Sequence, residues 1–310
     1  MRLIRGFNHP SPFLNGCVLT IGNFDGVHLG HRAVIKRLAE RGRELNLPTA
    51  IMLFEPQPLE YFLADNAPSR LMRLREKILA LNELPIENVI IVRFNRALAN
   101  YEPEQFIQKI LVAELNVKHL VIGDDFHFGK ARRGNFNLLK EQGKCLGFKV
   151  EKSESYQLGD FRISSTRIRD ALNADDLLQA RQFLGQDYSI CGRVAQGDKL
   201  GRTLGFPTAN INMLRRNTPV RGVFAVTMTG IDNQEFQGIA NVGVRPTIEE
   251  NQKVILEAHL FNFDQDIYGR YVSVRFKQKL RNEMRFDSLE QLQCQIRHDV
   301  AEAKAFFGKI

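Results

Sequence analysis

The pattern of hydrophobic and polar residues changes its character once along the chain, near residue 186. Before that point, short apolar runs alternate with amphipathic segments. The apolar runs predict buried strands at residues 17–21, 49–54, 89–92 and 119–122. The amphipathic segments predict helices at residues 29–43 and 71–84, and Pro103 favours the start of another. Strands and helices that alternate in this way are typical of an α/β fold with a parallel sheet and helices on both faces.

The second part of the chain has a different texture. Between residues 188 and 280 the apolar runs are rich in Val, Phe, Ile and Thr and are separated by glycine-containing turns. This pattern predicts antiparallel strands that close into a small barrel. From 288 to 307 the helical spacing returns, with Ser288 as the expected N-cap. We therefore predict two domains, residues 1–186 and 187–310, as a chain of 310 residues would favour.

Composition narrows the class of protein. Hydrophobic residues make up 44% and charged residues 25%, as in soluble globular proteins. The net charge of +8 is spread along the chain and not gathered in a stripe, so we expect no nucleic-acid partner. The four cysteines form no CxxC pair, which argues against zinc and disulfides, and we expect most of them to be buried. Without an apolar run of about 18 residues or a signal-peptide pattern, we expect a cytoplasmic protein with no membrane partner. We also expect a monomer, and the sequence leaves an oligomer open.

The segment GNFDGVHLGH follows the first predicted strand and opens a helix. Its glycines permit a tight turn, and the helix N-terminus offers unpaired N–H groups and a positive dipole end to an anion. His28 and His31 are three apart and project from one face, where they could donate to phosphate oxygens. We predict an ATP phosphate site made of Gly22, Asn23, Phe24, Asp25, Gly26, His28 and His31.

A second segment, ISSTRIRDAL, begins another helix with hydroxyl side chains and an arginine. Such groups suit phosphate, although Ser/Thr N-caps are common on their own. Together the two segments resemble the HxGH and ISSTxxR motifs of the nucleotidylyltransferase superfamily, which implies a Rossmann-like domain. The resemblance assigns ATP binding to Ser164, Ser165, Thr166 and Arg169, and implies attack of a substrate phosphate on the α-phosphorus.

The second part contains GRTLGFPTANI, a glycine-proline segment in which Thr208 and Asn210 alternate. A hydroxyl and an amide oxygen are hard ligands that suit Mg²⁺ together with phosphates. The segment resembles the riboflavin kinase signature, and the stretches around 222–226, 241–247, 256–269 and 280–286 agree with it. Over nearly the whole chain the sequence is therefore similar to the bacterial bifunctional riboflavin kinase/FAD synthetase family.

This resemblance implies two consecutive transfers: riboflavin and ATP give FMN, and FMN and a second ATP give FAD and pyrophosphate. It implies ATP binding in the kinase domain by Gly201, Gly205, Pro207, Thr208 and Asn210, with Thr208 and Asn210 also holding Mg²⁺. It also implies that Glu257 is the general base for the ribityl hydroxyl. Flavin-binding residues are expected in the segments FEPQPLEYF and DDFHFGKARRGN, and our candidates are Phe62, Asp125 and Phe128. The resemblance has one departure, because many members of that family have a histidine where this chain has Gln57.

Three other functions were weighed against this one. A monofunctional adenylyltransferase would explain the first two motifs but not the barrel. A nucleic-acid-binding barrel would explain the positive charge but not the paired histidines. A FAD synthetase with an inactive kinase domain is disfavoured because Thr208, Asn210 and Glu257 are all present.

Overall fold

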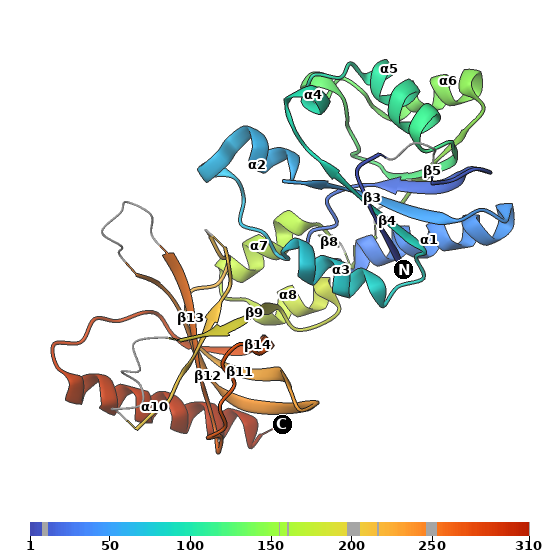
Figure 1. The fold of residues 1–310 in the computed structure, drawn as a ribbon. Coiled ribbons are helices and arrows are strands. Elements are labelled where there is room, and N and C mark those ends of the chain that lie inside the picture. Colours follow the sequence, from blue (N-terminus) through green and yellow to red (C-terminus); the bar gives the residue numbers. More distant parts are fainter. Residues whose placement is uncertain are drawn as a thin grey trace. The chain divides into compact units, whose positions relative to one another are not determined.

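The computed structural model describes residues 1–7, 12–154, 156–159, 161–196, 205–215, 217–245 and 253–309. The chain divides into two compact units (Figure 1). The first unit consists of Met1–Pro68 and Met72–Ser164, and the second of Ser69–Leu71 and Ser165–Ile310. Helices α7 (Ser165–Asn173) and α8 (Leu177–Leu184) are thereby grouped with the second unit. The domain boundary at residue 186 stays a prediction.

The first unit is built on a six-stranded parallel sheet, in the order β1-β4-β3-β2-β5-β6. Its strands are β1 (Arg2–Arg5), β2 (Cys17–Ile21), β3 (Thr49–Glu55), β4 (Asn88–Arg93), β5 (Val117–Gly123) and β6 (Lys149–Ser153). The four predicted strands are confirmed, and β1 and β6 were not expected. The chain passes from β2 to β3 and β4 on one side and then crosses to β5 on the other. Ligands of α/β sheets bind beyond the carboxyl ends of the strands at such a reversal.

Side chains that alternate along the strands build a core on each face of this sheet. Val18 and Ile51 pack with Ile35 of α1 (Leu29–Leu45) on the face that α3 (Leu74–Asn82) also covers. Their strand neighbours, such as Leu19, pack on the opposite face with Ile110 of the π-helical segment η2 (Phe106–Glu114), where α6 (Phe136–Leu146) also lies. The prediction of helices on both faces is confirmed (Figure 1). The shorter elements are α2 (Pro58–Leu63), η1 (Ala64–Asn66), α4 (Arg96–Ala99), α5 (Pro103–Gln105), η3 (Lys130–Arg132), β7 (Gln157–Leu158) and β8 (Phe161–Arg162).

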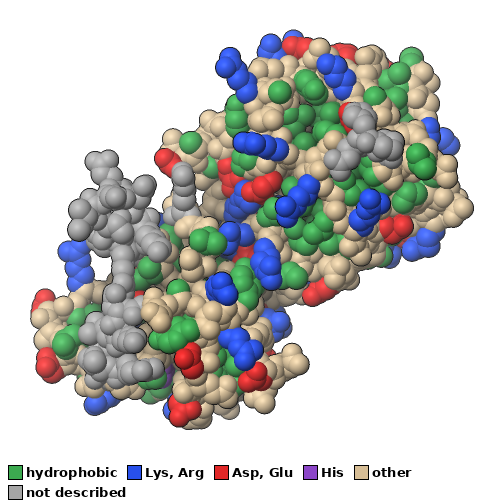
Figure 2. Space-filling view, in the orientation of Figure 1, with side chains coloured by type: hydrophobic (Ala, Val, Ile, Leu, Met, Phe, Trp, Pro, Cys, Tyr) green, Lys and Arg blue, Asp and Glu red, His purple; other side chains and the backbone are tan. Residues whose placement is uncertain are grey.

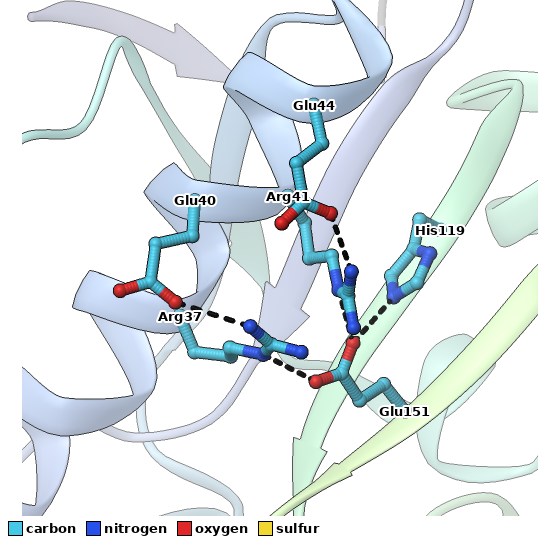
Figure 3. A network of polar contacts seen from close by, with 6 residues as sticks. All are labelled: Arg37, Glu40, Arg41, Glu44, His119 and Glu151. Carbon is cyan, nitrogen blue, oxygen red and sulfur yellow. Dashed lines mark hydrogen bonds and ion pairs between the residues drawn. The ribbon is translucent and has the colours of Figure 1, made fainter.

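An ion-pair network fastens the edge strand β6 to α1 (Figure 3). The Glu151 carboxylate accepts hydrogen bonds from the Nε atoms of Arg37 and Arg41 and lies 3.1 Å from His119 Nε2. Burial raises the pKa of Glu151, but the hydrogen bonds from the two arginines outweigh it, and the net pKa lies below its ordinary value. Glu151 is therefore held as a carboxylate between α1 and the sheet.

The second unit contains a closed antiparallel barrel in the order β10-β13-β12-β11-β14-β9. Its strands are β9 (Ser189–Ala195), β10 (Ala209–Asn212), β11 (Gly222–Ile231), β12 (Gln234–Arg245), β13 (Lys253–Leu260) and β14 (Tyr271–Arg281). Helix α10 (Leu289–Phe307) buries Ala303 against Ala225 and Ile239 of the barrel. Ser288 caps this helix as predicted, because its side chain accepts the N–H of Gln291. The predicted barrel and C-terminal helix are confirmed.

Two further expectations concern membranes and cysteines. Within the described ranges, no helix combines the length and apolar character needed to cross a bilayer. All four cysteines are free, and Cys145 and Cys294 are exposed. The expectation that most cysteines are buried was therefore wrong. Cys145 and Cys294 lie on amphipathic helices, where the outward face leaves even an apolar side chain in solvent.

Candidate functional site

The predicted phosphate turn connects β2 to α1 at the reversal point of the sheet. His28 is the N-cap of α1, and its Nδ1 accepts the backbone N–H of His31 at 3.3 Å. An accepting Nδ1 places the proton of the neutral ring on Nε2, which is then a donor. The first turn of α1 contains no acidic residue, so no side chain of its own neutralises the positive helix end. This arrangement is suited to an anion.

His31 lies stacked on His28, with ring centroids 3.6 Å apart. Its Nδ1 atom is buried and has no hydrogen-bond partner within the part of the chain that the structure describes. Burial lowers the pKa of His31 well below its ordinary value, and the neighbouring His28 and Lys77 lower it further. His31 is therefore neutral at neutral pH and carries an unsatisfied ring nitrogen, as a ligand-binding imidazole would.

Glycine at position 30 allows the close packing of this turn. A Cβ there would lie 3.2 Å from His28 Nδ1 and 3.6 Å from the carbonyl oxygen of Ile163. The second predicted motif begins at this same Ile163, so its first residue lies against the histidine turn. Ser164, the next residue, completes the first unit. Ser165, Thr166 and Arg169 belong to α7 in the second unit, where Arg169 Nε donates to the carbonyl of Ser69 at 2.7 Å.

Other residues of the turn make contacts that stabilise its conformation. The buried Asp25 carboxylate accepts the backbone N–H of Met72 at 3.0 Å. The buried Lys77 ammonium donates to the carbonyl of Asn23. The Phe24 ring is buried 4.9 Å from the His31 ring and supports it from one side. Gly26 has a φ of +88°, which favours glycine at that position. The direct contacts of these residues with ATP stay predictions.

Aromatic rings gather at the carboxyl ends of the adjacent strands β3 and β4. Phe54 and Phe94 have centroids 5.7 Å apart, and Tyr61 and Phe62 each lie within 6 Å of Phe94. Phe62, a predicted flavin residue, is 61% exposed at the end of this group. We refer to Phe54, Tyr61, Phe62 and Phe94 as the aromatic cluster. Sequence reasoning missed Phe94, and the signal for it is the pairing of β3 with β4, which the sequence does not give.

The other two flavin candidates are placed differently. The Phe128 ring is only 7% exposed and packs in the core between Phe106 and the partly buried Phe126. Asp125 lies 3.0 Å from Arg162, which also donates to Asp124 at 2.8 Å. Their roles in flavin binding stay predictions.

Gln57 is the N-cap residue of helix α2. In the sequence it lies between Phe54 and Tyr61 of the aromatic cluster. Its Nε2 is buried and has no hydrogen-bond partner among the described residues. A buried amide without a hydrogen-bond partner costs free energy of folding. A polar ligand atom that accepted a hydrogen bond from Gln57 Nε2 would remove this cost.

A pocket of about 340 Å³ opens on the barrel beside the predicted kinase motif. Pro207 and Thr208 line it together with Ala258, Leu260 and the loop from Phe263 to Tyr268. His259 Nδ1 donates to the carbonyl of Pro207 at 2.9 Å and so fixes this wall. Gly205 is described and has a φ of +83°, whereas Gly201 lies outside the described residues. The motif therefore forms one side of a cavity large enough for a nucleotide base.

A polar row crosses the outer face of the barrel next to this pocket. Asn210 is directly opposite Glu257, and Glu257 is directly opposite Asn241, so the three side chains share one face. A Cβ on Gly243 would collide with the carboxylate of Glu283, which therefore lies beside the row. Sequence reasoning identified Asn210 and Glu257 but missed Asn241 and Glu283. The register of three separate strands brings Asn210, Glu257 and Asn241 together, and Glu283 comes from the chain that follows β14.

Comparisons with known proteins cover both units. A family model described as FAD synthetase matches residues 11–167, and one described as riboflavin kinase matches residues 184–307. A protein of Haemophilus influenzae named bifunctional riboflavin kinase/FMN adenylyltransferase is 52% identical over 99% of this chain and 100% of its own length. A protein of Escherichia coli K12 with the same name is 48% identical over 99% of this chain and 98% of its own length.

A solved structure shares the whole architecture. It is described as a macrolide-efflux protein from Streptococcus pneumoniae, and it superposes with a TM-score of 0.81 at 28% identity. The superposition covers 96% of this chain and 97% of the other. The arrangement of an α/β unit followed by a barrel is therefore shared at full length.

Proposed function

This chain belongs to the bifunctional riboflavin kinase/FMN adenylyltransferase family, and from that premise we propose that it makes FMN from riboflavin and then FAD from FMN. Each step consumes one ATP. The observation that carries the proposal is that each matched region has its own group of residues suited to binding phosphate. The first has the stacked histidines at a helix N-terminus, and the second has the Thr208 and Asn210 segment beside a pocket.

In the adenylyl transfer, the turn from Gly22 to His31 holds the ATP phosphates with the N-terminal amides of α1. His28 and His31 donate to phosphate oxygens, and these bonds strengthen as charge builds in the transition state. Ser164, Ser165, Thr166 and Arg169 complete the phosphate contacts. A phosphate oxygen of FMN attacks the α-phosphorus, and the bond to pyrophosphate breaks. Catalysis is therefore positioning and charge stabilisation, without a covalent intermediate.

The aromatic cluster is our proposed contact for the flavin ring. The exposed Phe62 ring offers an apolar face, and the neighbouring rings hold it in place. Asp125 and Phe128 follow β5, the strand next to the histidine turn in the sheet, and we keep them as candidate contacts.

In the kinase step, Thr208 and Asn210 would hold Mg²⁺ and the ATP phosphates. The donor set fits this ion, because a hydroxyl and an amide oxygen are both hard oxygen ligands. Within the described residues no group of three His, Cys, Asp or Glu side chains could hold a metal by itself, so phosphate and water would supply the other ligands. Mg²⁺ would neutralise charge on the phosphates.

Glu257 is the proposed general base of this step. Its carboxylate takes the proton of the ribityl 5′-hydroxyl while that oxygen attacks the γ-phosphorus and ADP leaves. The pocket lined by Pro207 and Thr208 receives the nucleotide of this ATP. Thr208 precedes β10, and the start of β10 pairs with the part of β13 that contains Glu257. Thr208 and Glu257 therefore lie at the same end of this strand pair.

The experiment that tests this function incubates the chain with riboflavin, ATP and Mg²⁺ and separates the flavins over time. FMN is expected first and FAD later, and chelation of Mg²⁺ should stop FMN formation. The absence of both flavin products would refute the proposal. Supplied FMN with ATP should give FAD without riboflavin.

We further propose that the enzyme works in the cytoplasm as a monomer, without nucleic acid. Basic and acidic residues are spread along the chain and are not gathered in one run. Figure 2 shows Lys and Arg as well as Asp and Glu side chains on the drawn face. Light scattering of the purified chain tests the monomer, and oligonucleotide binding at low salt tests the exclusion of nucleic acid.

A further inference from the structure

The short segment Ser69–Leu71 is held by two arginines of the second unit, to which it belongs. Arg169 Nε donates to the Ser69 carbonyl at 2.7 Å. Arg215 donates from Nη1 to the Arg70 carbonyl at 3.0 Å and from Nη2 to the Leu71 carbonyl at 3.3 Å. Three consecutive backbone carbonyls are thus bound by two guanidinium groups.

Arg215 is itself fixed to the barrel. It lies three residues beyond the end of β10, and its Nη1 also donates to the hydroxyl of Tyr188 at 3.0 Å. Tyr188 is buried, and its ring stacks on Phe276 of β14 at 5.9 Å. Because a guanidinium is planar and carries several donors in a fixed fork, it can hold two carbonyls and a hydroxyl at once. Arg215 therefore joins the segment to the barrel wall.

The hydrogen bond to the Ser69 carbonyl constrains the orientation of Arg169. A guanidinium whose Nε is anchored on a carbonyl has its plane fixed, and the plane determines the direction of its Nη donors. Arg169 is the arginine of the second phosphate motif in the proposed adenylyl transfer. If the segment moved, the anchor of Arg169 would move with it.

We propose that Arg215 is a positioning residue for adenylyl transfer, which acts by fixing the segment that orients Arg169. The inference rests on the proposed function of Arg169. Arg215 lies in the region matched by the riboflavin kinase family model. The inference gives this residue an effect on adenylyl transfer, the reaction of the other matched region. Arg215 touches neither FMN nor ATP in this role.

Substitution of Arg215 tests the proposal in the full chain. Arg215→Gln should lower kcat/KM for ATP in FAD formation on the order of tenfold, because small misplacements of a binding group are costly. FMN formation from riboflavin should stay within about twofold of the wild type. Arg215→Lys should recover part of the loss, since an ammonium keeps the charge and can donate to a carbonyl but lacks the planar fork of the guanidinium. Arg275→Gln is the matched control, because Arg275 is anchored by Glu235 in the same barrel but not on this segment.

A double-mutant cycle separates positioning from a merely structural role. In an Arg169→Gln background, Arg215→Gln should have little further effect on FAD formation, because the group that it positions is gone. Independent, multiplying effects would overturn the inference, as would an equal loss of both activities or no loss at all. A wild-type chain that makes no FAD would overturn the proposed function as well. An unchanged Arg215→Gln variant beside an active wild type would overturn only this inference.

Discussion

The imidazole rings of His28 and His31 are stacked with their planes 18° apart, and the backbone N–H of His31 donates to Nδ1 of His28. The two residues thus hold each other through a ring contact and a helix cap. Two charged rings at this distance would repel strongly, and His28 is one of the groups that lower the pKa of His31. The His31 ring is therefore neutral at neutral pH.

Two substitutions at His28 should separate the helix cap from phosphate binding. His28→Asn keeps a side-chain oxygen near the position of Nδ1, so the cap of α1 is retained while the Nε2 donor is lost. We expect FAD formation to fall about 10²-fold and FMN formation to continue, so that FMN accumulates. His28→Ala should lose the same activity and also about 1 kcal/mol of stability. Time courses of both flavins, with thermal melting of each variant, provide the measurement. Equal melting of the two variants would show that His28 does not cap the helix.

The lowered pKa of His31 predicts how acid affects stability. The unfolded chain binds a proton at His31 below its ordinary pKa of 6.5, whereas the folded chain does not. The wild type should therefore lose stability as pH falls below 6.5, by up to about 1.4 kcal/mol per pH unit from this group. His31→Asn removes that loss, so the variant should gain on the wild type between pH 6.5 and 5.5. Urea unfolding at several pH values measures the difference. A difference that does not change with pH would contradict a neutral, buried His31.

Replacement of Glu257 should affect one reaction only. Glu257→Gln keeps the size and the place opposite Asn210 but removes the group that accepts the hydroxyl proton. We expect FMN formation to fall 10²- to 10⁴-fold, with FAD still formed from supplied FMN. Glu290→Gln, at the exposed start of α10, is the control in the same unit. Loss of both reactions in a folded Glu257→Gln protein would contradict two separate sites.

The sequence predicted those parts of the fold that depend on local pattern. The run CVLTI is buried at every position, and the predicted strand 17–21 coincides with β2. The predicted helix 29–43 extends two residues further, to Leu45, where Asn46 caps it in a left-handed conformation. Leu71 and Met72, by contrast, were assigned to a helix that begins only at Leu74. Their apolar side chains are buried in a loop whose backbone binds Arg215 and Asp25, and periodicity does not distinguish this from a helix face.

The proximity of candidate residues could be predicted where one segment supplies them. His28 and His31 belong to a single turn, so their spacing was enough to bring the two rings together, and their contact with ATP stays a prediction. Asn241 joins Asn210 and Glu257 only through the register of the barrel strands, and no local pattern encodes that register. Glu283 follows β14 and reaches the row only because the chain beyond this strand lies beside Gly243. Phe94 and Arg215 were missed for the same physical reason. Each is an ordinary residue until a distant strand or segment is placed beside it.

Glu151 offers the last prediction, on the stability of the sheet edge (Figure 3). Its pKa is lowered below the ordinary value of 4.5, so the folded chain releases this proton more readily than the unfolded chain. The ion pairs therefore stabilise the fold fully above about pH 4.5, and this contribution is lost as pH falls through the lowered pKa. At pH 7, Glu151→Gln should lower the melting temperature by about 2–4 °C and speed hydrogen exchange in β6.

The pH dependence and a control distinguish this effect from a general loss of packing. Glu141 is exposed on α6 of the same unit, and Glu141→Gln should leave the melting temperature unchanged. The difference between the wild type and Glu151→Gln should shrink as pH falls below 4.5, because protonated Glu151 no longer attracts Arg37 and Arg41. A difference that stays constant as pH falls below 4.5 would assign the effect of Glu151 to its shape and not to its charge. His119 also contacts this carboxylate, but burial lowers the pKa of His119 and keeps the ring neutral at pH 7. The effect of Glu151→Gln on the melting temperature should therefore be only slightly smaller in a His119→Gln background.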